Sequence, residues 1–167
     1  TCAYIENDTL AIAHVGDSRA YLLHEGTLIR VTRDHSYVEE LVDAGEITAD
    51  EARVHPNRSV ITRALGSDPA MYADHFTLHI EEGDRLILCS DGLSSMIPDS
   101  DIENIATQSS TAQICVDNLV DAALAAGGHD NVTVVVVDLV DDGVMRKAKR
   151  VRRRNVTIGV VLGLIIV

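Results

Sequence analysis

The sequence predicts an α+β domain in which helices pack on antiparallel sheet. Strand patterns and helix patterns occur in blocks along the 167 residues, without the strict alternation of parallel βαβ folds. Apolar residues make up 46% of the chain, which is enough to bury one core of ordinary size. Aromatic residues make up only 3%, so that core is expected to be aliphatic. This composition excludes a disordered or collagen-like chain.

The first four apolar runs predict an antiparallel meander. They cover residues 2–6, 9–15, 19–24 and 27–31. Turn residues join the members of each pair, Asn7-Asp8 in the first and Glu25-Gly26 in the second.

Two short helices and several strands are expected next. Residues 37–44 have helical spacing, and Gly45 follows them as a C-terminal cap. Thr48 and Glu51 have the spacing of a capping box that opens a second helix, which Pro56 stops. Further strands are predicted over residues 60–65, 73–80 and 85–90.

The sequence of residues 100–140 predicts two helices and a strand. Ser100 and Glu103 have capping-box spacing and predict a helix to about residue 108. Residues 111–126 carry an apolar stripe at helical spacing, and Gly127-Gly128 ends it. Residues 132–140 are rich in valine and predict a strand.

Charge divides the chain into two parts. Residues 1–143 hold all 26 acidic residues and seven arginines, which gives −19, whereas residues 144–167 hold seven basic residues and no acid. An acidic body repels phosphate, so nucleic acid is excluded as a partner. It is compatible with divalent cations, because a cation relieves the repulsion between clustered carboxylates.

The C-terminal part predicts a membrane anchor. Residues 146–154 are almost entirely basic, and residues 156–167 are apolar except for Thr157. We expect residues 143–155 to be a basic juxtamembrane linker and residues 156–167 to begin a truncated transmembrane helix. The domain would then lie on the cytoplasmic side of the cell membrane, in a single-pass protein. The alternative is a buried C-terminal strand, but cations packed just before such a strand would be hard to solvate.

Three aspartates occur in the same local setting. Asp17, Asp91 and Asp130 each lie at the end of a strongly apolar strand and next to or near glycine, with Gly16 and Gly92 as direct neighbours. Carboxylates brought together in this way select hard cations such as Mg²⁺ or Mn²⁺. The alternative is that all three are turn residues that accept hydrogen bonds from backbone amides.

Other chemistries have little support in the sequence. The three cysteines, Cys2, Cys89 and Cys115, form no CxxC pair, which disfavours a zinc knuckle or a disulfide framework. Neither a GxSxG elbow, an HExxH helix nor a P-loop occurs. His35 and His55 lie in loop-like segments and are the histidines expected to touch a site.

Five motifs then identify a family. They are GDSR at 16–19, TRDHS at 32–36, HPNRSVITRALGS at 55–67, GDRLILCSDGL at 83–93 and GGHDNVTVVVV at 127–137. In this order and spacing they resemble the metal-dependent protein serine/threonine phosphatases of the 2C type. The resemblance covers roughly residues 1–140 and is greatest to the membrane-anchored, actinobacterial-like branch that opposes bacterial Ser/Thr kinases.

The resemblance implies a four-layer α-β-β-α sandwich and a metal site. Asp91 and Asp130 would be ligands of a core pair of Mn²⁺ or Mg²⁺ ions, and Asp17 would share a third ion with Asp91. Asn131 would orient Asp130, and residues 36–58 would form the flap beside the cleft. Gly16 and Gly92 would support the site.

Two arginines are expected to have structural roles. Arg19 and Arg63 could pair with phosphate by charge, but their positions in the family pattern indicate that they stabilise the fold instead.

The chain also departs from the family pattern. The family begins with a segment that carries a phosphate-binding Arg and an Asp-Gly that bridges the core metals, and no Asp-Gly-x-Gly-Gly run occurs here. The chain also starts without Met, so we expect an N-terminally truncated phosphatase domain that is inactive alone. The parent protein would hydrolyse phosphoserine and phosphothreonine in proteins, kinases among them. The alternatives are a membrane-tethered pseudophosphatase or binding module and a cation-binding structural domain.

Overall fold

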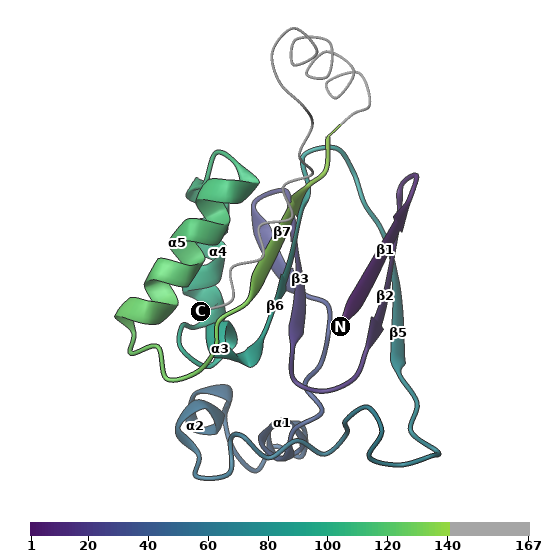
Figure 1. Ribbon diagram of the computed structural model, residues 1–167, viewed down its shortest axis with the longest axis vertical. Coiled ribbons are helices and arrows are strands. Elements are labelled where there is room, and N and C mark those ends of the chain that lie inside the picture. The colour runs from purple at the N-terminus through teal and green to yellow at the C-terminus, as the bar shows by residue number, and fades with distance from the viewer. Residues whose placement is uncertain (141–167) are drawn as a thin grey trace, which may run out of the picture.

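The computed structural model describes residues 1–140 (Figure 1). Its strands are β1 (Cys2–Glu6), β2 (Thr9–His14), β3 (Arg19–His24), β4 (Thr27–Arg30), β5 (Asp74–His79), β6 (Arg85–Cys89) and β7 (Val134–Asp138). Its helices are α1 (Tyr37–Asp43), α2 (Ala49–Val54), α3 (Asp91–Ser94), α4 (Asp99–Gln108) and α5 (Ala112–Ala125).

The strands form two antiparallel sheets that face each other (Figure 1). The first sheet has the order β1-β2-β5 and the second has the order β4-β3-β6-β7. Side chains alternate between the faces of a strand, so Leu22 and Leu86 of the second sheet face the first sheet. Their neighbours Tyr21 and Ile87 face the helices. The second sheet is therefore buried on both faces.

Helices α3, α4 and α5 cover the outer face of the second sheet (Figure 1). Leu119 and Ala123 of α5 are fully buried in the core between this helix layer and the sheet. Helices α1 and α2 lie instead at one end of the sandwich (Figure 1). The predicted α+β class with two antiparallel sheets is thus confirmed. Of the expected four layers, residues 1–140 supply three, because the described helices cover only one sheet.

The predicted meander is wrong, because the first four strands belong to two sheets. Strands β1 and β2 pair in the first sheet, and β3 and β4 pair in the second. The chain crosses between sheets after His14. The reason is that β2 and β3 each need a buried face, and they obtain it from each other: Leu10 packs in the same core as Leu22.

Two other local expectations also fail. Residues 60–65 form no strand, since Val60, Ile61 and Leu65 are all exposed and Ile61 makes only an isolated bridge to Ser36. Without a buried face, an apolar run gains nothing from sheet formation.

The capping box predicted at Ser100 is absent. Helix α4 begins earlier, at Asp99, with Pro98 as its N-cap residue. The Glu103 carboxylate accepts a hydrogen bond from the Leu28 backbone N–H at 2.8 Å and is therefore used to dock the helix on β4.

The expected linker over residues 143–155 and the membrane segment over 156–167 lie outside the described residues. Within residues 1–140, no helix combines the length and apolar character needed to span a bilayer.

Candidate metal site at the end of the sandwich

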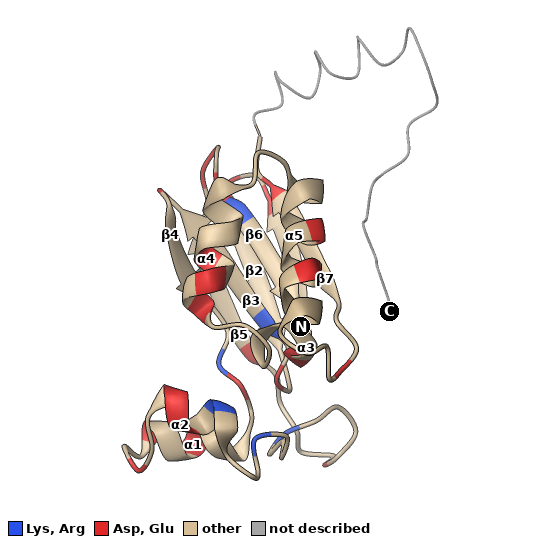
Figure 2. Cartoon of the chain, turned by 90° about the vertical axis from the view of Figure 1, so that its left-hand side faces the viewer, with Lys and Arg blue, Asp and Glu red and all other residues tan. Residues whose placement is uncertain are grey.

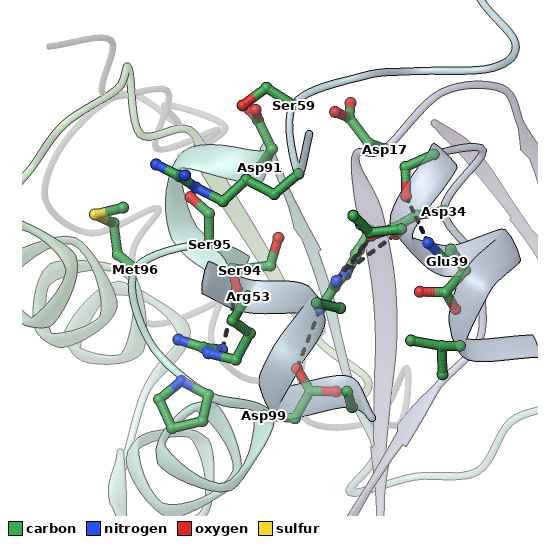
Figure 3. A pocket seen from close by; sticks show the side chains of 18 of the residues that line it. Asp17, Asp34, Glu39, Arg53, Ser59, Asp91, Ser94, Ser95, Met96 and Asp99 are labelled. Carbon is green, nitrogen blue, oxygen red and sulfur yellow. Dashed lines mark hydrogen bonds and ion pairs between the residues drawn. The ribbon is translucent and has the colours of Figure 1, made fainter. Parts of the chain in front are cut away.

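A pocket of about 460 Å³ opens where the sandwich meets the segment that carries α1 and α2 (Figure 3). Helix residues such as Val38, Val42 and Arg53 line one side of it. On the other side lie residues of the sandwich, among them Asp17 in the loop before β3 and Asp99 at the start of α4. The pocket therefore depends on both parts of the chain.

All three aspartates predicted from the sequence line this pocket. Asp17 lies in the loop between β2 and β3, Asp91 is the first residue of α3, and Asp130 precedes β7. Burial raises the pKa of the Asp91 carboxyl, and the charges of Asp17 and Asp130 raise it further. The three carboxylates thus repel one another, which is the situation that a bound cation relieves.

The carboxylates do not form a closed cage. In the described part of the chain, no group of three or more His, Cys, Asp or Glu side chains is arranged to hold a metal ion unaided. A cation that keeps several water ligands and takes only one or two carboxylates, as Mg²⁺ does, fits such a donor set. The assignment of Asp17, Asp91 and Asp130 as ligands stays a prediction.

Gly92 allows the Asp91 helix to touch the Asp130 loop. A Cβ atom at Gly92 would lie 2.4 Å from the Asn131 carbonyl oxygen, closer than real contacts allow. The Asn131 backbone N–H donates to Asp130 Oδ1 at 2.7 Å, so the residue after the aspartate holds its carboxylate. Gly92 and Asn131, two of the three residues predicted to support the site, thus meet where α3 contacts the Asp130 loop.

Ser90 fastens the same corner. Its hydroxyl donates to the Asn131 carbonyl at 3.1 Å and accepts from the Thr133 N–H at 3.0 Å. The Ser90 N–H also donates to the Thr133 carbonyl at 3.0 Å. These bonds continue the β6–β7 ladder up to the two aspartates and fix the relative position of their backbones.

Gly16 positions the third aspartate. It has φ of +104°, in the left-handed region that favours glycine, so the chain can turn sharply just before Asp17. Its N–H donates to His35 Nδ1 at 3.1 Å, and its carbonyl accepts from the His35 N–H at 2.7 Å. Of the two histidines expected to touch a site, His35 contacts the residue beside Asp17.

Both arginines expected to be structural are engaged by carboxylates of this chain. Asp34 receives hydrogen bonds from Arg19 Nε and Nη2, the shorter at 2.7 Å, and Arg19 Nη1 reaches Asp99 at 3.3 Å. This pairing with Asp34 raises the pKa of the Arg19 guanidinium, despite the opposing effect of burial. Arg63 Nη1 donates to Asp74 Oδ1 at 2.7 Å.

The sequence reasoning missed two arginines of the flap segment. Arg53 lines the pocket and donates to the carbonyls of Ser94 and Ile97, at 3.4 and 3.2 Å, which ties α2 to the end of α3 (Figure 3). Arg58 also lines the pocket and is exposed. Its place in the HPNRS motif was the signal that could have identified it.

Comparisons with known proteins agree with this geometry. Residues 1–132 match the sequence model of the family described as Protein phosphatase 2C. The serine/threonine phosphatase stp of Listeria welshimeri is 39% identical over 136 residues, which are 81% of this chain and 54% of that protein. The serine/threonine protein phosphatase PstP of Mycobacterium tuberculosis is 44% identical over 144 residues, which are 84% of this chain and 27% of that protein.

Solved structures give the same result. The crystal structure of the Mycobacterium tuberculosis phosphatase PstP/Ppp superposes with a TM-score of 0.78 at 41% identity, over 83% of this chain and 58% of that one. A catalytic domain of PstP in complex with two manganese ions superposes with a TM-score of 0.74 at 37% identity, over 83% and 57%. The chain thus spans about half the length of the first relatives that it matches.

Proposed function

Since the chain belongs to the protein phosphatase 2C family, we propose that the protein hydrolyses phosphoserine and phosphothreonine in other proteins with the help of divalent cations. One observation carries this proposal: Asp17, Asp91 and Asp130, from three separate segments, line one pocket. Because the chain spans about half the length of its first relatives, the activity and substrates of the whole protein are part of the proposal. No observation favours the non-catalytic alternatives.

The cations that fit the donor set are Mn²⁺ and Mg²⁺. The donors are carboxylate oxygens, the class that these ions prefer, and the mutual repulsion felt by Asp91 favours a cation nearby. Asp91 and Asp130 would hold the core ions, and Asp17 would hold a further ion together with Asp91. When bound, such ions neutralise charge on a phosphate and activate water as a nucleophile.

The residues of the chain do three things in this reaction. The Asn131 N–H holds one oxygen of Asp130, and Gly92 lets Asp91 approach the same loop. Arg58, exposed at the pocket, supplies positive charge toward a phosphorylated substrate. The thiol of Cys89 does not serve as nucleophile, because burial raises its pKa to about 12.

The test is Mn²⁺-dependent dephosphorylation of a phosphothreonine peptide by the full-length protein. We expect Asp91→Asn to reduce the rate by more than about 100-fold, because it removes a ligand shared between ions. Asp17→Asn should reduce it less. The matched control is Asp117→Asn, a change on the exposed face of α5. Near-wild-type rates for both pocket variants would contradict the proposal.

We also propose that the protein is a single-pass membrane protein whose phosphatase domain lies in the cytoplasm, where phosphorylated proteins including Ser/Thr kinases are its partners. The support is the basic run over residues 146–154 followed by the apolar run over residues 156–167. Protease protection of a tag inserted before residue 144 tests this orientation. The tag should resist protease added outside intact cells, and cleavage there would overturn the proposed location.

A further inference from the structure

His35 holds both peptide groups of Gly16. Its ring Nδ1 accepts a hydrogen bond from the Gly16 N–H at 3.1 Å, and its backbone N–H donates to the Gly16 carbonyl at 2.7 Å. The side chain is 8% exposed, so water competes little for these bonds. Gly16 has no side chain to restrict it, and the ring of His35 supplies the restriction just before Asp17.

The hydrogen bond from Gly16 sets the tautomer of the ring. Because Nδ1 accepts a hydrogen bond, we assign the proton of the neutral ring to Nε2, which then donates to Asp74 Oδ2 at 2.9 Å. Arg63 Nη1 lies at the same distance, 2.9 Å, from Nε2, so the far edge of the ring contacts both members of the Arg63–Asp74 pair. The other oxygen of Asp74 accepts from Arg63 Nη1 at 2.7 Å. The Arg63 guanidinium in turn lies over the Tyr72 ring, 4.4 Å from its centre. The ring is thus held at its far edge by a fixed carboxylate.

The backbone of His35 also joins the two ends of the segment that contains the flap. The His35 carbonyl accepts from the Thr62 N–H at 2.8 Å, and the next residue, Ser36, bridges to Ile61. The Ser36 hydroxyl accepts from the Glu39 N–H and so caps α1. Both ends of the segment over residues 36–62 therefore meet at the residue that holds Gly16.

We propose that His35 is a positioning residue: its neutral ring fixes the Gly16 peptide and thereby directs the Asp17 carboxylate to the cation. This inference rests on the proposed function, because it needs Asp17 to be a ligand. A histidine that served only to fill space would be replaced with equal effect by any side chain of similar size. If His35 positions Gly16, its replacement must keep a hydrogen-bond acceptor where Nδ1 lies, because that atom accepts from the Gly16 N–H.

Two substitutions in the full-length protein separate these roles. His35→Asn places an amide oxygen where Nδ1 lies and keeps an acceptor for Gly16, whereas His35→Gln extends toward Asp74 and loses that acceptor. The first readout is hydrogen exchange of the Gly16 amide without metal. The second is Mn²⁺ affinity measured by titration calorimetry. The control is His79→Asn, since His79 is 64% exposed on β5. Thermal unfolding verifies that each variant is folded.

We expect His35→Gln to speed Gly16 exchange by about tenfold or more and to weaken the Mn²⁺ site that includes Asp17 by about 10- to 100-fold, the usual effect of losing an outer-shell contact. His35→Asn should remain within about threefold of the wild type on both measurements, by the same rule. Equal losses for the two variants, or unchanged Gly16 exchange in His35→Gln, would overturn the inference while leaving the proposed function intact. Absence of Mn²⁺ binding by the wild-type protein would instead overturn the metal site itself, and the inference with it.

Discussion

One buried histidine contributes to how the stability of this protein depends on pH. His14, at the end of β2, is 1% exposed, and its Nε2 lies 2.9 Å from the Arg33 carbonyl. Burial lowers the pKa of His14 below its ordinary value of 6.5; the bond to Arg33 opposes this effect, and nearby His35 adds to it. The folded protein therefore keeps His14 neutral at pH values where the unfolded chain binds a proton.

This difference predicts a loss of stability in mild acid. Below pH 6.5 the unfolded state binds more protons at His14 than the folded state, so the free energy of unfolding falls as the pH falls from 6.5 toward the lowered pKa. Above that range the contribution is fully present. Urea unfolding at pH 7.5 and 5.5 measures it, and His14→Gln should reduce the pH dependence. An unchanged slope in His14→Gln would show that other groups cause it.

Residue patterns predicted part of the site. The three aspartates could be recognised because each follows an apolar strand and has glycine close by, a local feature. The role of His35 could not be derived, because its partner Gly16 lies 19 residues away and the contact depends on how β2 and the next loop pack. Arg53 was missed for the same reason, since its acceptors are the carbonyls of Ser94, at the end of α3, and of Ile97, which follows that helix.

At the level of elements, long-range hydrogen bonds decide where helices dock. Arg85 on β6 is 7% exposed, and its Nη1 donates to the carbonyls of Ala106 and Ser109 at 2.6 and 2.9 Å. It therefore satisfies backbone acceptors at the C-terminal end of α4. The Asp138 carboxylate on β7 accepts a hydrogen bond from Arg85 Nε. One buried cation thus joins two strands and a helix.

The close approach of α3 to the Asp130 loop gives a prediction for Gly92. In Gly92→Ala the added methyl would meet the Asn131 carbonyl at 2.4 Å, so the helix or the loop must shift. We expect the free energy of unfolding to fall by about 1–3 kcal/mol, together with weaker Mn²⁺ binding because Asp91 and Asp130 separate. Chemical denaturation and calorimetry measure the two effects. Ser100→Ala, an exposed change on α4 outside the residues that line the pocket, is the control and should alter neither. A Gly92→Ala protein with wild-type stability and affinity would show that the contact is not needed.

The positions of the helices and strands along the sequence were largely predictable, but which strands pair and which elements pack together was not. The box formed by Thr48 and Glu51 is present with both of its hydrogen bonds, because it needs only local contacts. The capping box expected at Ser100 is absent, because α4 begins at Asp99 and the Glu103 carboxylate accepts a hydrogen bond from the Leu28 N–H on β4 instead. The division of β1–β4 between two sheets also escaped prediction, since strand pairing depends on faces that only the whole core defines.

The whole molecule combines an acidic surface with a pocket built from two parts of the chain. Figure 2 shows acidic residues, in red, on α1, α2, α4 and α5. The sandwich supplies Asp17, Asp91 and Asp130, and the segment with α1 and α2 covers them from the other side. Such an arrangement attracts cations, and it gives the flap segment control over how a protein substrate reaches the site.

Arg53 provides the test of that arrangement, because it fastens α2 to the sandwich side of the pocket through the carbonyls of Ser94 and Ile97. In Arg53→Ala we expect the sandwich to lose less than about 1.5 kcal/mol, since two long hydrogen bonds at the edge of the core are removed. Hydrogen exchange over residues 44–56 should accelerate, because local opening of α2 becomes easier. The KM for a phosphothreonine peptide should rise about three- to tenfold while kcat stays within about twofold, as expected when substrate binding but not chemistry is affected.

Glu46→Gln, an exposed change in the turn between α1 and α2, is the control. If α2 exchanges at the wild-type rate in Arg53→Ala, or if kcat falls and KM does not change, the flap segment does not govern access.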